Sequence, residues 1–133
     1  MKTTVISDGA WGTALATVLC ENGHDVTMWG PFPDYIEIMK DKRENIRFLP
    51  GIPLPSTLKL SDNMAAAVKD SEIIVLATPS QFMRASLEEL KECYDSSQVL
   101  VNVAKGIENG TLKRMSELCD EILGKSTYTV LSG

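Results

Sequence analysis

The sequence predicts an α/β fold with a doubly wound, mostly parallel sheet. Apolar, β-rich runs alternate with helical patterns from one end of the chain to the other, as in strands joined by right-handed crossover helices. Four of these runs are almost continuously apolar, which is typical of strands covered on both faces. The chain has 133 residues, 44% of them hydrophobic, and contains no linker or internal repeat. We therefore expect a single domain over residues 1–133.

Six segments have the composition of strands, and they are rich in valine, isoleucine, threonine and leucine. In chain order they are Thr3–Ser7, Asp25–Trp29, Leu58–Leu60, Ile73–Ala77, Val99–Val103 and Tyr128–Leu131.

Five segments with helical spacing lie between these strands. They are Trp11–Asn22, Tyr35–Lys42, Asn63–Lys69, Gln81–Tyr94 and Leu112–Leu123. The first has Leu15, Val18 and Leu19 on one face, which is predicted to pack on the sheet, and it stops at Gly23.

Helix starts are indicated by residues that favour the N-terminal cap. We expect Pro33-Asp34 to begin the second helix, and Asp62, Ser80 and Thr111 to cap the three helices that follow. From Glu44 to Thr57 the periodicity fails and prolines recur, so this segment is predicted to be an ordered irregular loop.

The turn between the first strand and the first helix reads Ile6-Ser7-Asp8-Gly9-Ala10-Trp11-Gly12. Gly9 and Gly12 match the second and third glycines of the Rossmann-type dinucleotide fingerprint, whereas Ser7 replaces the first. Glycines there permit a tight turn, close approach of a pyrophosphate and close helix–strand packing. A strand–helix turn that merely uses glycine is the alternative interpretation.

The choice between NAD and NADP stays open in the sequence. An acidic residue at the end of the second strand selects NAD, and a nearby arginine accommodates the 2′-phosphate of NADP. The segment Gly30–Asp34 has neither at the expected place. Asp8 is also unexpected in a phosphate cradle, and its carboxylate is predicted to point either at the ligand or away to solvent.

Composition excludes several classes of function. The net charge is −5 and no basic run is present, which argues against a nucleic-acid partner. No apolar run approaches the ~20 residues that cross a bilayer. Three cysteines without a CxxC pair and one histidine argue against a metal site and fit reduced thiols in a cytoplasmic protein.

Several stretches, in the right order along the whole chain, resemble the glycerol-3-phosphate dehydrogenase family. They are the cofactor loop Gly9–Ala16, the second strand Val26–Trp29, the proline-rich segment Glu44–Gly51 with Leu54-Pro55, Thr78–Phe82, Ala104–Glu108 and Leu131–Gly133.

The resemblance implies roles for particular positions. Around the loop glycines Gly9 and Gly12, Ala10 and Trp11 would contact the cofactor, and Pro31 or Phe32 would lie by the adenosine. Pro79 and Phe82 would line the cofactor cleft, Lys105 would reach both cofactor and substrate, and Gly133 would border the substrate. Without the resemblance, Phe82 is equally well a core aromatic and Lys105 a solvated loop lysine.

The activity implied by the resemblance is reversible hydride transfer between NAD(P)H and dihydroxyacetone phosphate. It gives sn-glycerol 3-phosphate and feeds glycerophospholipid synthesis. The expected partners are NAD or NADP, the small phosphorylated substrate and, for the parent enzyme, a second copy of itself.

In the family the catalytic lysine lies in a helical C-terminal domain, which is absent from this chain, so residues 1–133 alone are expected to be inactive. Ser7-Asp8 and Pro31 depart from the family pattern. The alternatives are another Rossmann dehydrogenase of the same superfamily and a non-catalytic nucleotide-sensing module.

Overall fold

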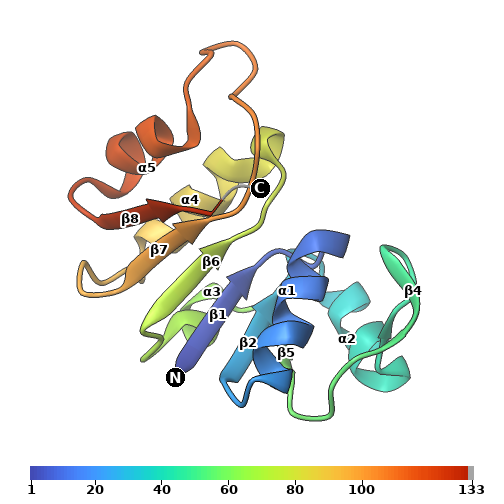
Figure 1. Cartoon of the computed structure of the whole chain (residues 1–133). Helices are drawn as coiled ribbons and strands as arrows, with labels where there is room; N and C mark the ends of the chain where they lie inside the picture. The colour runs from blue at the N-terminus through green and yellow to red at the C-terminus, as the bar shows by residue number, and fades with distance from the viewer. Residues whose placement is uncertain (132–133) are drawn as a thin grey trace.

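The main sheet contains six strands in the order β5-β2-β1-β6-β7-β8, and every pairing in it is parallel (Figure 1). The structure, a computed structural model, describes residues 1–131, so the predicted substrate-side Gly133 lies outside the described residues. The strands are β1 (Lys2–Ile6), β2 (Asp25–Trp29), β5 (Lys59–Ser61), β6 (Ile73–Leu76), β7 (Val99–Asn102) and β8 (Thr127–Val130).

Helices cover both faces of this sheet, as Figure 1 shows. One face carries α1 (Ala10–Glu21) and α2 (Pro33–Lys42), and the other carries α3 (Met64–Val68), α4 (Met83–Lys91) and α5 (Met115–Leu123). A short 3₁₀ turn, η1 (Ser80–Phe82), precedes α4. This strand order and double winding confirm the predicted Rossmann-type fold.

Alternating side chains of the strands fill two cores. In β1, Val5 joins the core under α1 and α2, whereas Ile6 joins the core under α3, α4 and α5. Val75 and Leu76 of β6 alternate in the same way. The near-continuous apolar runs are therefore explained by burial on both faces.

The face of α1 that packs on the sheet differs in part from the prediction, since Leu15 and Leu19 pack against the core but Val18 does not. Gly12, Thr13 and Ala16 are buried, whereas Val18 is 51% exposed. Small residues face the sheet because this helix approaches β1 closely, and larger aliphatic side chains are displaced to its flanks.

The prediction of an irregular loop from Glu44 to Thr57 was wrong in part. Strands β3 (Glu44–Asn45) and β4 (Leu49–Pro53) form a separate antiparallel hairpin. Because a two-stranded sheet consists only of edges, its prolines cost few ladder hydrogen bonds. The prolines hid this hairpin in the sequence.

Three helix starts were also predicted incorrectly. The cap of α3 is Asn63, whose side chain accepts a hydrogen bond from the Ala66 amide at 2.9 Å, not Asp62. The turn η1 separates Ser80 from the start of α4.

Helix α5 begins at Met115 and not at Leu112. Leu112 has a φ of +59°, which a right-handed helix excludes. The preceding segment closes on itself instead, since the Glu108 amide donates to the Lys113 carbonyl at 2.8 Å.

Candidate functional site

The turn from β1 into α1 leaves backbone donors available to an anion. Gly9 is the N-cap residue, with φ −69° and ψ 176°, and no side chain caps this helix end. The first turn of α1 carries no acidic residue. Free amide groups and the helix dipole therefore favour a negatively charged ligand here.

The two loop glycines differ in what surrounds them. A Cβ built on Gly9 meets only Ser7 Oγ, at 3.4 Å, so the space above Gly9 is open. A Cβ built on Gly12 lies 3.0 Å from the Ser7 carbonyl oxygen and 3.3 Å from Ala77 Cβ. Gly12 therefore serves close helix–strand packing, while Gly9 leaves room for a ligand.

Ser7 occupies a backbone conformation that favours glycine. Its φ is +137°, a region that L-residues adopt only with strain. Its Oγ accepts a hydrogen bond from the Gly9 amide at 3.0 Å, which holds the turn in shape. The serine thus stands at the first fingerprint position in a conformation that glycine adopts more readily.

Asn45 attaches the turn Ser7–Gly9, called the phosphate turn below, to the β3–β4 hairpin. The sequence did not predict this role. Its Nδ2 donates to the Asp8 carbonyl at 2.6 Å and to Thr13 Oγ1 at 2.9 Å. Its Oδ1 accepts from the Tyr35 hydroxyl and from the Phe48 amide. The sequence offered one sign of this role, since Asn45 lies in Glu44–Gly51, a segment that resembles the family.

The structure excludes one of the two predicted orientations of the Asp8 carboxylate. The residue is 7% exposed, so it does not face solvent. Its side chain reaches across to the end of β2, where Oδ2 lies 2.5 Å from the position that a Cβ of Gly30 would occupy. Oδ2 has no hydrogen-bond partner among the described residues. Burial raises the pKa of this carboxyl, against smaller lowering effects of a backbone hydrogen bond and the Arg47 charge.

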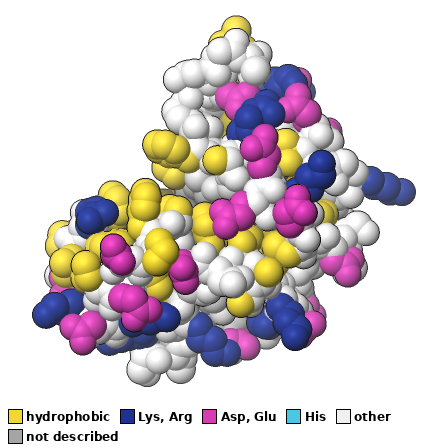
Figure 2. Space-filling view, turned by 180° about the vertical axis from the view of Figure 1, so that it is seen from behind, with side chains coloured by type: hydrophobic (Ala, Val, Ile, Leu, Met, Phe, Trp, Pro, Cys, Tyr) yellow, Lys and Arg dark blue, Asp and Glu magenta, His cyan; other side chains and the backbone are white. Residues whose placement is uncertain are grey.

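A cleft of about 540 Å³ opens at the carboxyl ends of β1, β2 and β6. Six of the predicted cofactor residues line it: Gly9, Ala10, Pro31, Phe32, Pro79 and Phe82. Asp8, Trp29 and Phe48, which were not predicted, also line it. Phe82 is 65% exposed, so it is not a core aromatic. In the view of Figure 2, hydrophobic side chains gather between the upper and lower parts of the molecule.

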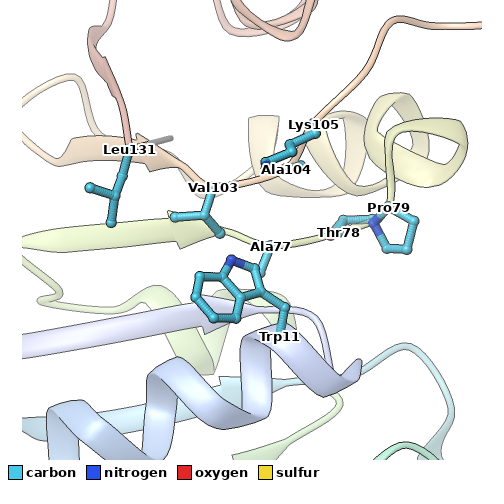
Figure 3. A pocket seen from close by; sticks show the side chains of 8 residues that line it. All are labelled: Trp11, Ala77, Thr78, Pro79, Val103, Ala104, Lys105 and Leu131. Atoms are coloured by element: carbon cyan, nitrogen blue, oxygen red, sulfur yellow. The ribbon is translucent and has the colours of Figure 1, made fainter. Parts of the chain in front are cut away.

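A second hollow of about 490 Å³ adjoins the cleft, since Thr78 and Pro79 line both. Two further predicted residues, Trp11 and Lys105, line it, whereas Gly12 lines neither hollow. Figure 3 shows Trp11 rising from α1 on one side, with Ala104 and Lys105 on the opposite side. Lys105 is exposed and lies in the loop that follows β7.

The loop that carries Lys105 is attached to α4 by an ion-pair cluster. Arg84 Nε donates to Glu108 at 2.8 Å, and its Nη1 donates to Glu121 of α5 at 2.6 Å. The Arg84 guanidinium lowers the pKa of Glu108 to about 2. Gln81 adds contacts to the backbone of Ile107 and Asn109.

Two other classes of site find no support in the described part of the chain. Residues 1–131 contain no group of three His, Cys, Asp or Glu side chains arranged to hold a metal ion. Over the same residues, no helix has the length and apolar character that crossing a membrane requires.

Comparison with known proteins agrees with this geometry. A profile described as "NAD-dependent glycerol-3-phosphate dehydrogenase N-terminus" matches residues 2–133. The glycerol-3-phosphate dehydrogenase [NAD(P)+] of Bacillus mycoides is 44% identical over 99% of this chain, which spans 40% of that relative's length.

Solved structures are similar as well. Glycerol-3-phosphate dehydrogenase from Coxiella burnetii superimposes with a TM-score of 0.92 at 29% identity, over 99% of this chain and 40% of that one. The enzyme from Saccharomyces cerevisiae gives a TM-score of 0.86 at 33% identity, over 100% and 42%. The chain therefore belongs to the family of NAD-binding N-terminal domains of NAD(P)-dependent glycerol-3-phosphate dehydrogenases.

Proposed function

We propose that this chain is the cofactor-binding part of an oxidoreductase that interconverts sn-glycerol 3-phosphate and dihydroxyacetone phosphate, feeding glycerophospholipid synthesis. The observation that best supports this proposal is the pair of adjoining hollows at the carboxyl edge of the parallel sheet. Sheets of this kind bind dinucleotides at that edge. The chain spans about 40% of the length of its curated relatives, so the complete reaction is proposed for a longer protein.

The cleft and the second hollow divide the proposed site. Gly9 and Ala10 hold the pyrophosphate through the start of α1, with Gly12 packed behind it. Pro31 and Phe32 contact the adenosine, and Pro79 and Phe82 close the opposite wall. Bound NAD(P)H supplies the hydride. The open space above Gly9 and the uncapped start of α1 support a phosphate-bearing ligand in this cleft.

The second hollow is where we place the reacting end. Trp11 forms one wall, and Lys105 provides a cation for the phosphate or hydroxyl end of the substrate. Gly133, outside the described residues, is proposed to border the substrate. The catalytic lysine is assigned to a helical C-terminal domain beyond this chain, and the longer protein is proposed to be a cytoplasmic homodimer.

Titration of NADH into the purified chain tests cofactor binding, because Trp11 and Trp29 both border the proposed site and report it by fluorescence quenching. Phe82→Ala is expected to weaken NADH binding roughly fivefold, since an aromatic contact contributes about 1 kcal/mol. Val18→Ala, at an exposed position on the outside of α1, is the matched control and leaves binding unchanged. Equal effects of the two substitutions would remove the cleft from the proposal.

The same preparation tests the division of labour between domains. We expect no oxidation of NADH that depends on dihydroxyacetone phosphate, because proton transfer and substrate orientation each contribute several kcal/mol. Steady substrate-dependent turnover by residues 1–133 would show that the proposed second domain is not required.

A further inference from the structure

We propose that the Asp8 carboxylate binds the adenosine ribose and makes this domain prefer NAD over NADP. The inference rests on the proposed function and deepens it, since it assigns the cofactor preference to a residue of the phosphate turn.

The position of the carboxylate is the first argument. In dinucleotide-binding sheets, an acidic side chain at the end of the second strand receives the ribose hydroxyl. That position is Gly30 in this chain, immediately after Trp29 ends β2. The Asp8 Oδ2 atom lies 2.5 Å from where a Gly30 Cβ would stand, and its Cγ lies 3.0 Å away. A carboxylate therefore lies beside the position of that acid, but it comes from the turn after β1.

The unpaired state of Oδ2 is the second argument. Asp8 is 7% exposed, and no described residue donates a hydrogen bond to this oxygen. Buried acceptors without a donor are rare in proteins and indicate a missing partner. Asp8 lines the cleft together with Gly9, Pro31 and Phe32, so a rotation of its side chain brings this covered oxygen to a ligand in the cleft. A ribose hydroxyl supplies the missing donor.

The charge of the site sets the preference. A 2′-phosphate brings negative charge and no strong donor to a buried carboxylate, so NADP meets repulsion where NAD forms a hydrogen bond. Arg47 is the cation whose charge acts on Asp8. Its guanidinium lies 4.4 Å from the centre of the Tyr35 ring, and the side chain is exposed, so solvent screens its compensation of a 2′-phosphate.

Calorimetric titration of the 133-residue chain with NAD⁺ and NADP⁺ tests the proposal. The unmodified chain is expected to bind NAD⁺ at least about tenfold more tightly than NADP⁺. Asp8→Ala should weaken NAD⁺ binding by about tenfold and bring the ratio of the two affinities close to one. Asp41→Ala, which removes the same charge from an exposed position on α2, should change neither.

A transplanted acid gives an independent check. In the double variant Asp8→Ala with Gly30→Asp, the carboxylate returns to the tip of β2, and the preference for NAD⁺ should return with it. Asp8→Asn keeps the size of the side chain and carries the test if Asp8→Ala fails to fold, as judged by circular dichroism.

The outcomes distinguish failure of the ribose assignment from failure of the proposed function. Binding of both dinucleotides with a ratio that Asp8 substitutions leave unchanged overturns the ribose assignment alone. NADP⁺ binding as tight as NAD⁺ binding in the unmodified chain also overturns it. If neither dinucleotide binds to the folded chain, the proposed function itself is overturned, and the inference with it.

Discussion

Asp8 also has a measurable effect in the absence of any ligand. A buried acceptor without a donor costs on the order of 1 kcal/mol, and Oδ2 is such an atom. We therefore expect Asp8→Ala to increase the free energy of unfolding of the ligand-free chain by about 1 kcal/mol near neutral pH. Urea denaturation followed by circular dichroism measures this difference, with Asp41→Ala as the control for loss of charge.

The pH dependence of this effect has a defined sign. Burial raises the folded-state pKa of Asp8 above its ordinary value of 3.8, so between these values the folded chain holds the proton more strongly than the unfolded chain. Stability attributable to Asp8 therefore falls as pH rises through this window. The gap between Asp8→Ala and the unmodified chain should be largest near neutral pH and shrink toward pH 3.8. A gap that grows on acidification would contradict the buried, unpaired carboxylate.

The sequence predicted the positions of some residues in the turn after β1 and not the contacts of others. Gly9 and Gly12 were identified from the sequence because their spacing reflects local turn geometry. The orientation of Asp8 was not, because it depends on the absence of a side chain at Gly30, on another strand. Asn45 was missed because its partners, Asp8 and Thr13, become neighbours only after the hairpin packs against the phosphate turn.

At the scale of elements, the junction of β1 with α1 gives a paired prediction. Gly12→Ala should reduce the free energy of unfolding by about 1–2 kcal/mol, because the new methyl group meets the Ser7 carbonyl oxygen at 3.0 Å. Gly9→Ala should cost only about 0.5 kcal/mol yet weaken NADH binding at least about tenfold, since its methyl group blocks the phosphate approach. Chemical denaturation and NADH titration of both variants measure the two quantities. Similar stability losses for the two would contradict this separation of roles.

The attachment of the Lys105 loop to α4 predicts an acid-dependent change. Glu108 has a folded-state pKa of about 2 against an ordinary value of 4.5, so its stabilising contribution is present above 4.5 and is lost as pH falls toward 2. Glu108→Gln should lower the melting temperature near neutral pH and lose this dependence. It should also accelerate amide hydrogen exchange in residues 107–114.

Glu37→Gln is the matched control for that experiment, because its ion pair with Lys40 is exposed on α2 and exposed pairs contribute little. Equal effects of the two substitutions on hydrogen exchange near Lys105 would show that Arg84 and Glu108 do not hold the loop.

Element boundaries were less predictable than element order. The six strands of the main sheet follow from their apolar composition, and each was found within about two residues of its predicted range. The start of α5 was wrong because Thr111 resembles a cap, while the left-handed Leu112 and the Glu108–Lys113 hydrogen bond prevent a helix there. Such contacts depend on how a loop closes, which helical periodicity does not encode.

At the scale of the whole molecule, a doubly wound parallel sheet follows from strand–helix alternation and the handedness of crossovers. The hairpin β3–β4 does not follow from that rule, because it lies outside the main sheet and contains prolines. It nevertheless contributes Asn45 to the phosphate turn and Phe48 to the cleft. The family-like residues of this segment indicated its importance but not its conformation.

The proposed division of the site between two domains gives a prediction for Lys105 in the proposed longer protein. There, Lys105→Ala should reduce kcat/KM for dihydroxyacetone phosphate by more than about tenfold, since a charge-assisted contact to the substrate is lost. In the 133-residue chain the same substitution should change the NADH dissociation constant by less than about twofold. Steady-state kinetics and fluorescence titration measure the two effects. A loss confined to NADH affinity would move Lys105 from the substrate to the cofactor.

The crowding of Asp8 against Gly30 also restricts how this site can evolve. A side chain acquired at position 30 while Asp8 is present would overlap both its carboxylate and Ile36 Cδ1, whereas shortening Asp8 first leaves only the contact with Ile36. The order of the two substitutions therefore affects the stability of the intermediate sequence. Among related sequences, we expect an aspartate at position 8 to occur with glycine at position 30, and a larger residue at position 30 to occur with a small one at position 8. A change of cofactor preference in this lineage would then proceed through position 8 before position 30.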